Sequence, residues 1–146
     1  MKSSNQEGFS LIELLLVVVI IGIVAAMAIP FLQKSLIAAQ NRNVYATLRS
    51  MHTTEVGFFS QHERFARLDE VNSAMGNGLG PISGNQLFRY KFVIEMVPST
   101  PTDAELKSGY TIRAIRNVPG EAILYQYEIS NDGKLNQIFP ANGQEP

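Results

Sequence analysis

The sequence predicts an α+β fold in which one long N-terminal helix packs, through its C-terminal half, on a four-stranded antiparallel β-meander. Three observations support this prediction. Residues 9–32 are almost wholly apolar, the next residues repeat apolar side chains at helical spacing, and the second half of the chain alternates apolar and polar residues between short turns. The only amphipathic helix available to cover the sheet is the continuation of the apolar segment.

Composition limits the class of protein. The chain has 146 residues, of which 45% are hydrophobic and 17% charged, and this leaves room for one modest domain. A formal net charge of -1 gives no electrostatic indication of a nucleic-acid partner. Because the chain has no cysteine, disulfides, thiolate metal sites and a cysteine nucleophile are all excluded.

Residues 1–8 are short and polar, and the apolar segment follows them directly. As a helix, residues 9–32 span about 36 Å at roughly 1.5 Å per residue, which is long enough to cross a bilayer. Since lipid offers the backbone no hydrogen-bond partner, this segment is expected to be helical in spite of its β-branched residues.

Glu13 is the only ionisable side chain in this segment. A carboxylate near the centre of a membrane helix costs roughly 2.5 to 3.5 kcal/mol, so such acids are candidates for a functional role. The alternative is that Glu13 lies at the level of the lipid headgroups, where its cost is small.

Gly22 and Pro30 are the two helix breakers of the segment. Because a proline inside a helix removes one backbone hydrogen bond, the stretch between them is expected to bend or loosen. The alternative is that Pro30 marks only the end of the membrane segment.

After Pro30 the apolar side chains fall on one stripe of a helix, and polar side chains take the other faces. The helix is therefore predicted to run from about Phe9 to Phe59. The stripe consists of Ile37, Val44, Leu48, Met51 and Phe58. The expected solvent-exposed positions are Gln33, Lys34, Gln40, Asn41, Arg42, Arg49, His52 and Glu55.

Residues 60–86 are expected to be an irregular connection that ends in a glycine-rich loop, without the Gly-Lys-Ser/Thr ending of a phosphate-binding loop. Residues 87–139 then alternate as four strands separated by turns, the clearest of which is a hairpin turn at Asn131-Asp132-Gly133. The predicted strands are Phe88 to Met96, Tyr110 to Ala114, Ile123 to Ile129 and Leu135 to Phe139.

The sequence offers no constellation of catalytic or metal-binding residues. His52 and His62 are the only histidines, and neither has the spacing of a metal pair or of a nucleophile and its base. His52 and Glu55 lie three residues apart on a helix, which is typical of a solvated surface pair. No enzyme activity, metal or cofactor is expected. The remaining acids expected as isolated loop residues are Asp69, Glu70, Asp103 and Glu105.

The segment from Gly8 to Leu15, followed by the apolar residues and Pro30, resembles the N-terminus of type IV pilins and the related pseudopilins. The resemblance is detailed between Gly8 and Pro30, and the helix-then-meander layout extends it over the whole chain. It implies that residues 1–8 are a leader, which a prepilin peptidase removes by cutting between Gly8 and Phe9. It also implies that the new terminal residue, Phe9, is N-methylated.

The same resemblance implies a partner for Glu13. After cleavage the ammonium of Phe9 lies one helical turn away, and in the filament the acid would meet the amine of a neighbouring subunit. A buried carboxylate and a buried ammonium are each costly alone, but together they define a register. The stretch from Gly22 to Pro30 corresponds to the region that loosens on assembly in some pilins. Many pilins close their C-terminal region with a disulfide, whereas residues 135–146 must here be held by packing and hydrogen bonds.

The implied organisation is a leader at 1–8, a transmembrane and assembly helix at 9–32 and a globular head at 33–146. The precursor would be a single-pass protein of the inner membrane with its head outside the cytoplasm. It would then polymerise into an extracellular pilus for adhesion, twitching motility or DNA uptake. The implied partners are further copies of the chain, the prepilin peptidase and N-methyltransferase, the inner-membrane assembly machinery and the lipid bilayer.

Three alternatives stay open. The chain could be a pseudopilin of a type II secretion system, although the lack of tryptophan and of an evident calcium loop favours a pilin. It could be a secreted domain, since Ala26-Met27-Ala28 is a possible signal peptidase site, although the apolar segment is long for a signal peptide and contains Glu13. It could also be a membrane-anchored domain that never polymerises.

Overall fold

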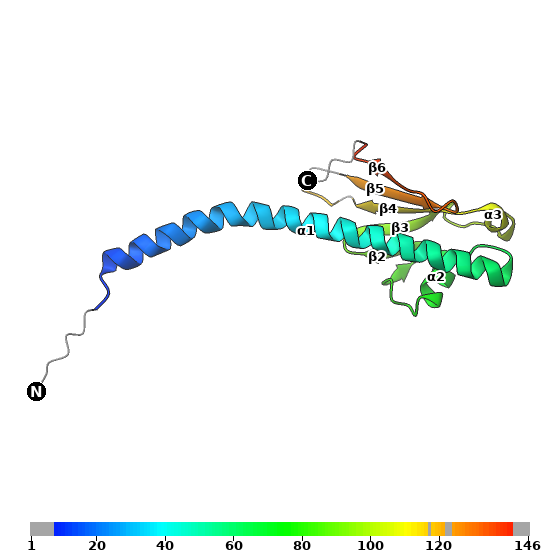
Figure 1. Ribbon diagram of the computed structural model, residues 1–146, viewed down its shortest axis with the longest axis horizontal. Helices are drawn as coiled ribbons and strands as arrows, with labels where there is room; N and C mark the ends of the chain where they lie inside the picture. Colours follow the sequence, from blue (N-terminus) through cyan, green and yellow to red (C-terminus); the bar gives the residue numbers. More distant parts are fainter. Residues whose placement is uncertain (1–7, 117, 122–123, 142–146) are drawn as a thin grey trace, which may run out of the picture. The chain divides into compact units, whose positions relative to one another are not determined.

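The computed structural model describes residues 8–116, 118–121 and 124–141 (Figure 1). The chain divides into two compact units, Met1–Ile37 and Ala38–Pro146. Helix α1, Leu11–His62, contributes its N-terminal segment to the first unit and its C-terminal segment to the second. Its bounds lie within three residues of the predicted ones, and the helix continues through Pro30.

The second unit contains one antiparallel sheet whose strands follow one another in chain order, so the predicted α+β class and the meander are confirmed. The described residues form six strands, whereas four were predicted. The strands are β1 (Ile82–Ser83), β2 (Gln86–Arg89), β3 (Phe92–Val97), β4 (Thr111–Arg116), β5 (Tyr125–Ser130) and β6 (Leu135–Phe139). Ile123, predicted in the third strand, lies outside the described residues.

The single strand predicted from Phe88 to Met96 is wrong, because the chain reverses within it. Tyr90 and Lys91 have φ angles of 50° and 66°, and Arg89 pairs with Phe92 across the two-residue turn. Positive φ at both central residues is the geometry of a type I′ hairpin, for which Asn-Gly is the usual signal. The Tyr-Lys pair gave no such signal. Cross-strand partners share a face, so Leu87, opposite Ile94, is buried in the core and Phe88 is 42% exposed.

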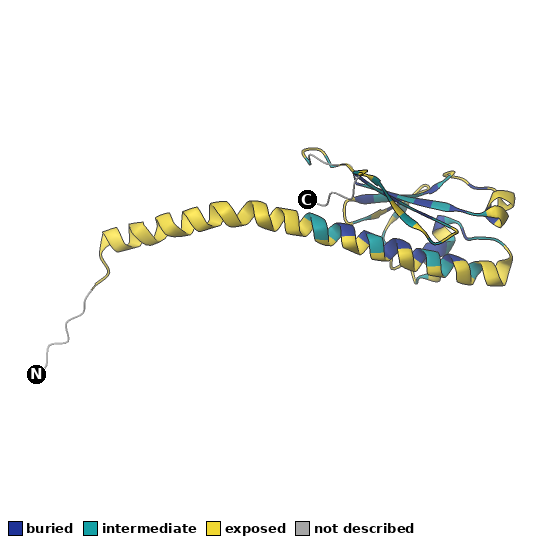
Figure 2. Cartoon of the chain, turned by 45° about the horizontal axis from the view of Figure 1, so that its top comes forward, coloured by how far each residue is buried: buried dark blue, intermediate teal, exposed yellow. Residues whose placement is uncertain are grey.

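The C-terminal half of α1 lies along the sheet, as predicted (Figures 1 and 2). Val44, Leu48 and Met51 are fully buried, and the buried side chains of β3, β4 and β5 complete this core. The ring of Tyr45 meets the ring of Tyr127 on β5 edge to face, with 5.8 Å between their centroids. Burying such side chains is worth about 1.5 to 3 kcal/mol each, which holds the helix on the sheet.

Two short helices occupy stretches that were expected to be loops. Helix α2 spans Leu68–Ala74 and helix α3 spans Asp103–Ser108, between β3 and β4. The backbone N–H of Thr102 donates to the carboxylate of Glu105 at 2.8 Å, and the hydroxyl of Thr102 accepts from the N–H of Glu105 at 3.3 Å. This is a capping box, which stabilises the first turn. The acids Asp69, Glu70, Asp103 and Glu105 therefore belong to helices, which were too short to show an apolar period.

The hairpin turn predicted at Asn131-Asp132-Gly133 is confirmed between β5 and β6. The carboxylate of Asp132 accepts from the backbone N–H of Lys134 at 3.0 Å and from the hydroxyl of Ser130 at 2.9 Å. Gly133 has a φ of 74°, and a Cβ there would lie 2.9 Å from Nε2 of His52. Glycine therefore suits position 133 for two reasons: its φ angle is positive, and the His52 side chain of α1 approaches it closely.

Candidate assembly site

The residues expected at the cleavage site precede α1. Gly8, Phe9 and Ser10 are exposed and outside any helix or strand, and Phe9 is 83% exposed. A Cβ on Gly8 would have no atom within 4 Å. The Gly8–Phe9 peptide bond thus lies in an accessible segment, as a peptidase requires. Residues 1–7 of the expected leader lie outside the described residues.

Glu13 lies in the first turn of α1, where its carboxylate accepts from the backbone N–H of Ser10 at 2.9 Å. In return, the carbonyl of Ser10 accepts from the N–H groups of Glu13 at 3.1 Å and Leu14 at 3.3 Å. A glutamate three residues after the capping serine commonly satisfies its N–H in this way, and the N-terminus of a helix favours a negative charge. In the uncleaved chain Glu13 therefore already has a local partner.

The N-terminal segment of α1 is not covered by any of the described residues. Every residue from Leu11 to Leu36 is exposed, on all faces of the helix. An 18-residue window of α1 has a mean hydropathy of 3.0, and by length and composition this is the one helix among the described residues that could cross a membrane. An apolar surface of this extent marks contact with lipid or with other proteins.

Gly22 and Pro30, the predicted weak points, both lie inside α1. A Cβ on Gly22 would have no atom within 4 Å, so packing within the molecule does not require glycine there. Because proline has no N–H, Pro30 leaves the carbonyl of Ala26 without its usual helical donor. Glu13 and Pro30 are separated by about 25 Å of helix, at roughly 1.5 Å per residue. The predicted residues are thus distributed along one helix rather than gathered in one pocket.

The sequence reasoning missed Glu55, which was expected to be solvated and is fully buried. Its Oε2 accepts from the backbone N–H of Ala66 at 2.7 Å, while its Oε1 is buried without a partner among the described residues. Burial raises the pKa of Glu55 to about 7, and nearby Glu70 adds to this, whereas the Ala66 N–H and the charge of Arg64 act in the opposite direction. The carboxyl group thus links α1 to the chain that follows it.

The predicted solvated pair of His52 and Glu55 is also wrong, because Nδ1 of His52 lies 2.6 Å from the hydroxyl of Tyr110. Asn41, also expected to be exposed, is 1% exposed. The heptad spacing of the apolar stripe would have found both buried polar residues, since Asn41, Val44, Leu48, Met51 and Glu55 follow one another in steps of three and four. Ile37 and Phe58, which were placed in the stripe, are only half-buried.

Arg116 is a third buried polar side chain that the sequence reasoning missed. It is 1% exposed, and its Nε and Nη2 donate to the two carboxylate oxygens of Glu121 at 2.6 and 2.7 Å. Its Nη1 donates to the side chain of Gln40 on α1, and its guanidinium lies over the ring of Phe92. The hydrogen bonds from Arg116 lower the pKa of Glu121, and the contact with Gln40 joins the sheet to α1.

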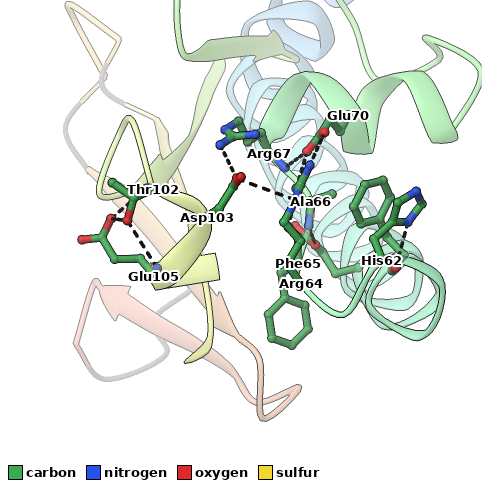
Figure 3. A network of polar contacts seen from close by, with 11 residues as sticks. His62, Arg64, Phe65, Ala66, Arg67, Glu70, Thr102, Asp103 and Glu105 are labelled. Atoms are coloured by element: carbon green, nitrogen blue, oxygen red, sulfur yellow. Dashed lines mark hydrogen bonds and ion pairs between the residues drawn. The ribbon is translucent and has the colours of Figure 1, made fainter. Parts of the chain in front are cut away.

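A network of ion pairs connects the segment that follows α1 with α2 and α3 (Figure 3). Arg64 donates to both carboxylate oxygens of Glu70 at 2.8 and 2.7 Å, and Arg67 pairs with Asp103. The hydrogen bonds from Arg64 lower the pKa of Glu70 to about 2. Each of these charged side chains is engaged with another element of the fold, so the network stabilises this region. The described residues include no group of three or more His, Asp or Glu side chains that could hold a metal ion.

Comparison with known proteins places the similarity at the N-terminus. Residues 3–29 match the family model described as the prokaryotic N-terminal methylation motif. The chain is 38% identical over 82 residues to the type IV major pilin protein PilA of Myxococcus xanthus (strain DK1622), which covers 56% of this chain and 35% of that protein. It is 48% identical over 49 residues to the fimbrial protein EcpB of Eikenella corrodens, covering 34% of this chain and 31% of that protein. The chain thus spans about a third of the length of these relatives, and no solved structure matches it.

Proposed function

We propose that this chain is a type IV pilin, a structural subunit that polymerises through its N-terminal helix after its leader has been removed. The methylation motif at residues 3–29 carries the proposal. The accessible segment at Gly8 and Phe9, and the uncovered apolar helix that follows, are what a processed and polymerising subunit needs. The similarity to the Myxococcus pilin and the Eikenella fimbrial protein supports the same assignment.

The proposed first step is cleavage between Gly8 and Phe9 by a prepilin peptidase, followed by N-methylation of Phe9. Because the space around Gly8 is open within the chain, a larger residue there would not disturb the fold. Any loss of processing in such a variant would therefore arise in the active site of the peptidase. Cleavage also creates an ammonium group four residues before Glu13, inside an otherwise apolar segment.

The proposed second step is an exchange of partners by Glu13. In the precursor its carboxylate accepts from the N–H of Ser10 at 2.9 Å, which requires no other molecule. In a filament the N-terminal ammonium of a neighbouring subunit supplies a full positive charge, and a charge-assisted hydrogen bond is roughly twice as strong as a neutral one. Glu13 thus selects one register between adjacent helices, since an unpaired carboxylate among apolar helices is costly.

The apolar segment of α1 determines the proposed location of the protein. Before assembly the bilayer of the inner membrane covers this surface, and after assembly the helices of neighbouring copies cover it in an extracellular filament. The assembly machinery of the inner membrane would transfer the subunit from one environment to the other. The proposed role is structural and not enzymatic, since the polar clusters of the described residues are occupied in holding the fold together.

The first test is the intact mass and N-terminal sequence of the protein recovered from its native membrane and from the sheared cell-surface fraction. The proposal expects a chain that begins at methylated Phe9 in both fractions. A chain beginning at Ile29 would instead indicate a secreted domain, and one beginning at Met1 would indicate a membrane anchor that is not processed. A processed chain that is confined to the membrane would favour a pseudopilin over a pilin.

A further inference from the structure

The two ends of the globular unit, measured along the C-terminal segment of α1, carry opposite charges. The acidic end surrounds the C-terminus of α1 and helices α2 and α3, and it holds five acidic and three basic side chains among the described residues. They are Glu63, Arg64, Arg67, Asp69, Glu70, Asp103, Glu105 and Lys107. The basic end surrounds residues 40–46 of α1, the β2–β3 turn and the residues after β4. It holds four basic side chains and one acidic one, which are Arg42, Arg89, Lys91, Arg116 and Glu121.

The ion pairs within each end leave some charged side chains unpaired: acids at the acidic end and arginines at the basic end. At the acidic end Arg64 and Arg67 pair with Glu70 and Asp103, while Glu63 and Asp69 are exposed and have no cation within 4.0 Å among the described residues. At the basic end Lys91 and Arg116 share Glu121. Arg42 and Arg89 have no carboxylate within 4.0 Å in the described part of the chain. Exposed Arg49, two helical turns after Arg42, adds to the basic side.

The Arg89 side chain is half-buried and lines a groove of about 310 Å³ beside α1. Its Nη1 donates to the backbone carbonyls of Gly78 and Leu79, both at 2.8 Å, and its guanidinium lies over the ring of Tyr90 with 4.9 Å to the centroid. Asn43, Thr47 and Ser50 line the facing wall of the groove. A guanidinium that is fixed by neutral carbonyls keeps its full charge, and it loses little entropy when a carboxylate binds.

The two ends cannot neutralise each other within one molecule. Arg42 and Glu63 are separated by about 30 Å along α1, whereas charges in physiological salt are largely screened beyond about 8 Å. A helical polymer requires a contact between two different, complementary surfaces of the subunit. The globular unit has such a pair of surfaces.

We propose that the acidic end of one copy docks on the basic end of another copy in the filament, so that Glu63 and Asp69 meet Arg42 and Arg89. This inference rests on the proposed polymerisation, and it adds a second, polar contact to the one between apolar helices. The expected partner is thus a second copy of this chain, in a head-to-tail arrangement. Because the contact is exposed and ionic, filaments should be less stable at high salt.

The test is a reciprocal charge reversal in the full-length protein, expressed as the only subunit. One variant carries Arg42→Glu and Arg89→Glu, a second carries Glu63→Lys and Asp69→Lys, and a third combines all four changes. Lys134→Glu is the control, since the Lys134 side chain is 78% exposed on the β5–β6 turn, and its reversal adds a negative charge near α3 without changing Glu63 or Asp69. Filament is measured by shearing and quantitative blotting, and processing by intact mass.

The expected result is a loss of about tenfold or more in filament for each single-end variant, with processing intact, and a substantial recovery for the combined variant. The control should assemble like the wild type. If the loss of the Arg89 contacts prevents folding of the multiple variants, the test is repeated with the single variant Arg42→Glu and the double variant Arg42→Glu with Glu63→Lys.

Normal filament from either single-end variant would overturn the inference, and so would a loss that the combined variant does not reverse. The basic end would instead be a binding surface for a polyanion if its variants assembled normally but their sheared filaments no longer retained double-stranded DNA. None of these outcomes affects the proposed function, which is tested by the mature N-terminus and by Glu13.

Discussion

The N-terminal and C-terminal segments of α1 share one secondary structure but owe it to different surroundings. In the N-terminal segment every side chain from Leu11 to Leu36 is exposed and nearly every one is apolar, which suits the proposed contact with lipid or with other copies of the chain. In the C-terminal segment a single face is buried against the sheet, with Val44, Leu48 and Met51 fully covered. The comparison shows that the C-terminal segment is completed by its own chain, whereas the described residues leave the N-terminal segment uncovered.

The polar residues of the two segments differ in the same way. Glu13 lies in an exposed segment and accepts a hydrogen bond from the neighbouring N–H of Ser10. Glu55 is enclosed by its own fold and bound to Ala66. Glu13 thus stays available for the proposed role in assembly, whereas Glu55 serves internal structure. The following predictions test this difference, beginning with the largest expected effect.

Replacement of Glu13 by alanine is expected to abolish filaments when the variant is the only subunit, while membrane insertion continues. The reason is that the neighbour's ammonium would be buried without a counter-charge, which costs several kcal/mol for each contact. Filament in the sheared fraction and protein in the membrane fraction are measured together. Leu14→Ala is the matched control, since it removes apolar contacts without removing the charge. Normal filaments from Glu13→Ala would contradict the role of Glu13.

Replacement of Arg116 by methionine should destabilise the globular unit by about 3 to 5 kcal/mol, because Glu121 loses its buried partner and keeps only the exposed Lys91. Thermal and urea unfolding of the full-length protein in detergent, followed by circular dichroism, measures the effect. Arg113→Met is the control. Arg113 also donates to a carboxylate, that of Glu128 at 2.7 Å, but its side chain is 32% exposed, so a loss below about 1 kcal/mol is expected. Equal losses in both variants would contradict the importance of burial.

The raised pKa of Glu55 predicts that the free energy of unfolding depends on pH. Its pKa is raised from 4.5 to about 7 in the fold, so the folded state holds the proton more tightly than the unfolded state. The stability contributed by the protonated carboxyl is fully present below pH 4.5 and is lost as the pH rises through about 7. The loss amounts to at most about 3 kcal/mol, since one unit of pKa corresponds to roughly 1.4 kcal/mol.

Glu55→Gln removes this titration and should flatten the corresponding region of the curve. The measurement is the free energy of unfolding of wild type and variant between pH 4 and pH 9, roughly spanning both pKa values. The difference between the two proteins should change over the interval from 4.5 to about 7 and be constant above it. A difference that is independent of pH would show that Glu55 titrates alike in the folded and unfolded states.

The smallest expected effect comes from the two helical glycines for which a Cβ would meet no atom within 4 Å, Gly22 and Gly57. Gly57→Ala should stabilise the globular unit by about 0.5 to 1 kcal/mol, because alanine loses less backbone entropy in a helix. Gly22→Ala should leave unfolding of the globular unit unchanged, because it lies in the N-terminal segment of α1. Unfolding in detergent measures both. A shift from Gly22→Ala equal to that from Gly57→Ala would show that the two segments of α1 unfold together.

Much of the architecture could be predicted from side-chain periodicity. The helix, the meander and the Asn131-Asp132-Gly133 turn were correct because each has a local signal in the chain. The β2–β3 hairpin was missed because Tyr90 and Lys91 carry no turn signal, and α2 and α3 were missed because they are short. The motif from Gly8 to Glu13 could be recognised without any structure, because it is a pattern of neighbouring residues.

By itself the sequence determined the apolar segment, the acid within it, the site expected for cleavage and the alternation that makes a sheet. These are properties of neighbouring residues, and period or composition expresses them directly. Only the tertiary structure decided that Glu55 and Asn41 are buried and that Arg116 binds Glu121 inside the fold. Only the tertiary structure gathered opposite charges at the two ends of the globular unit. The reason is that burial and charge pairing depend on residues that are distant along the chain and adjacent only after folding.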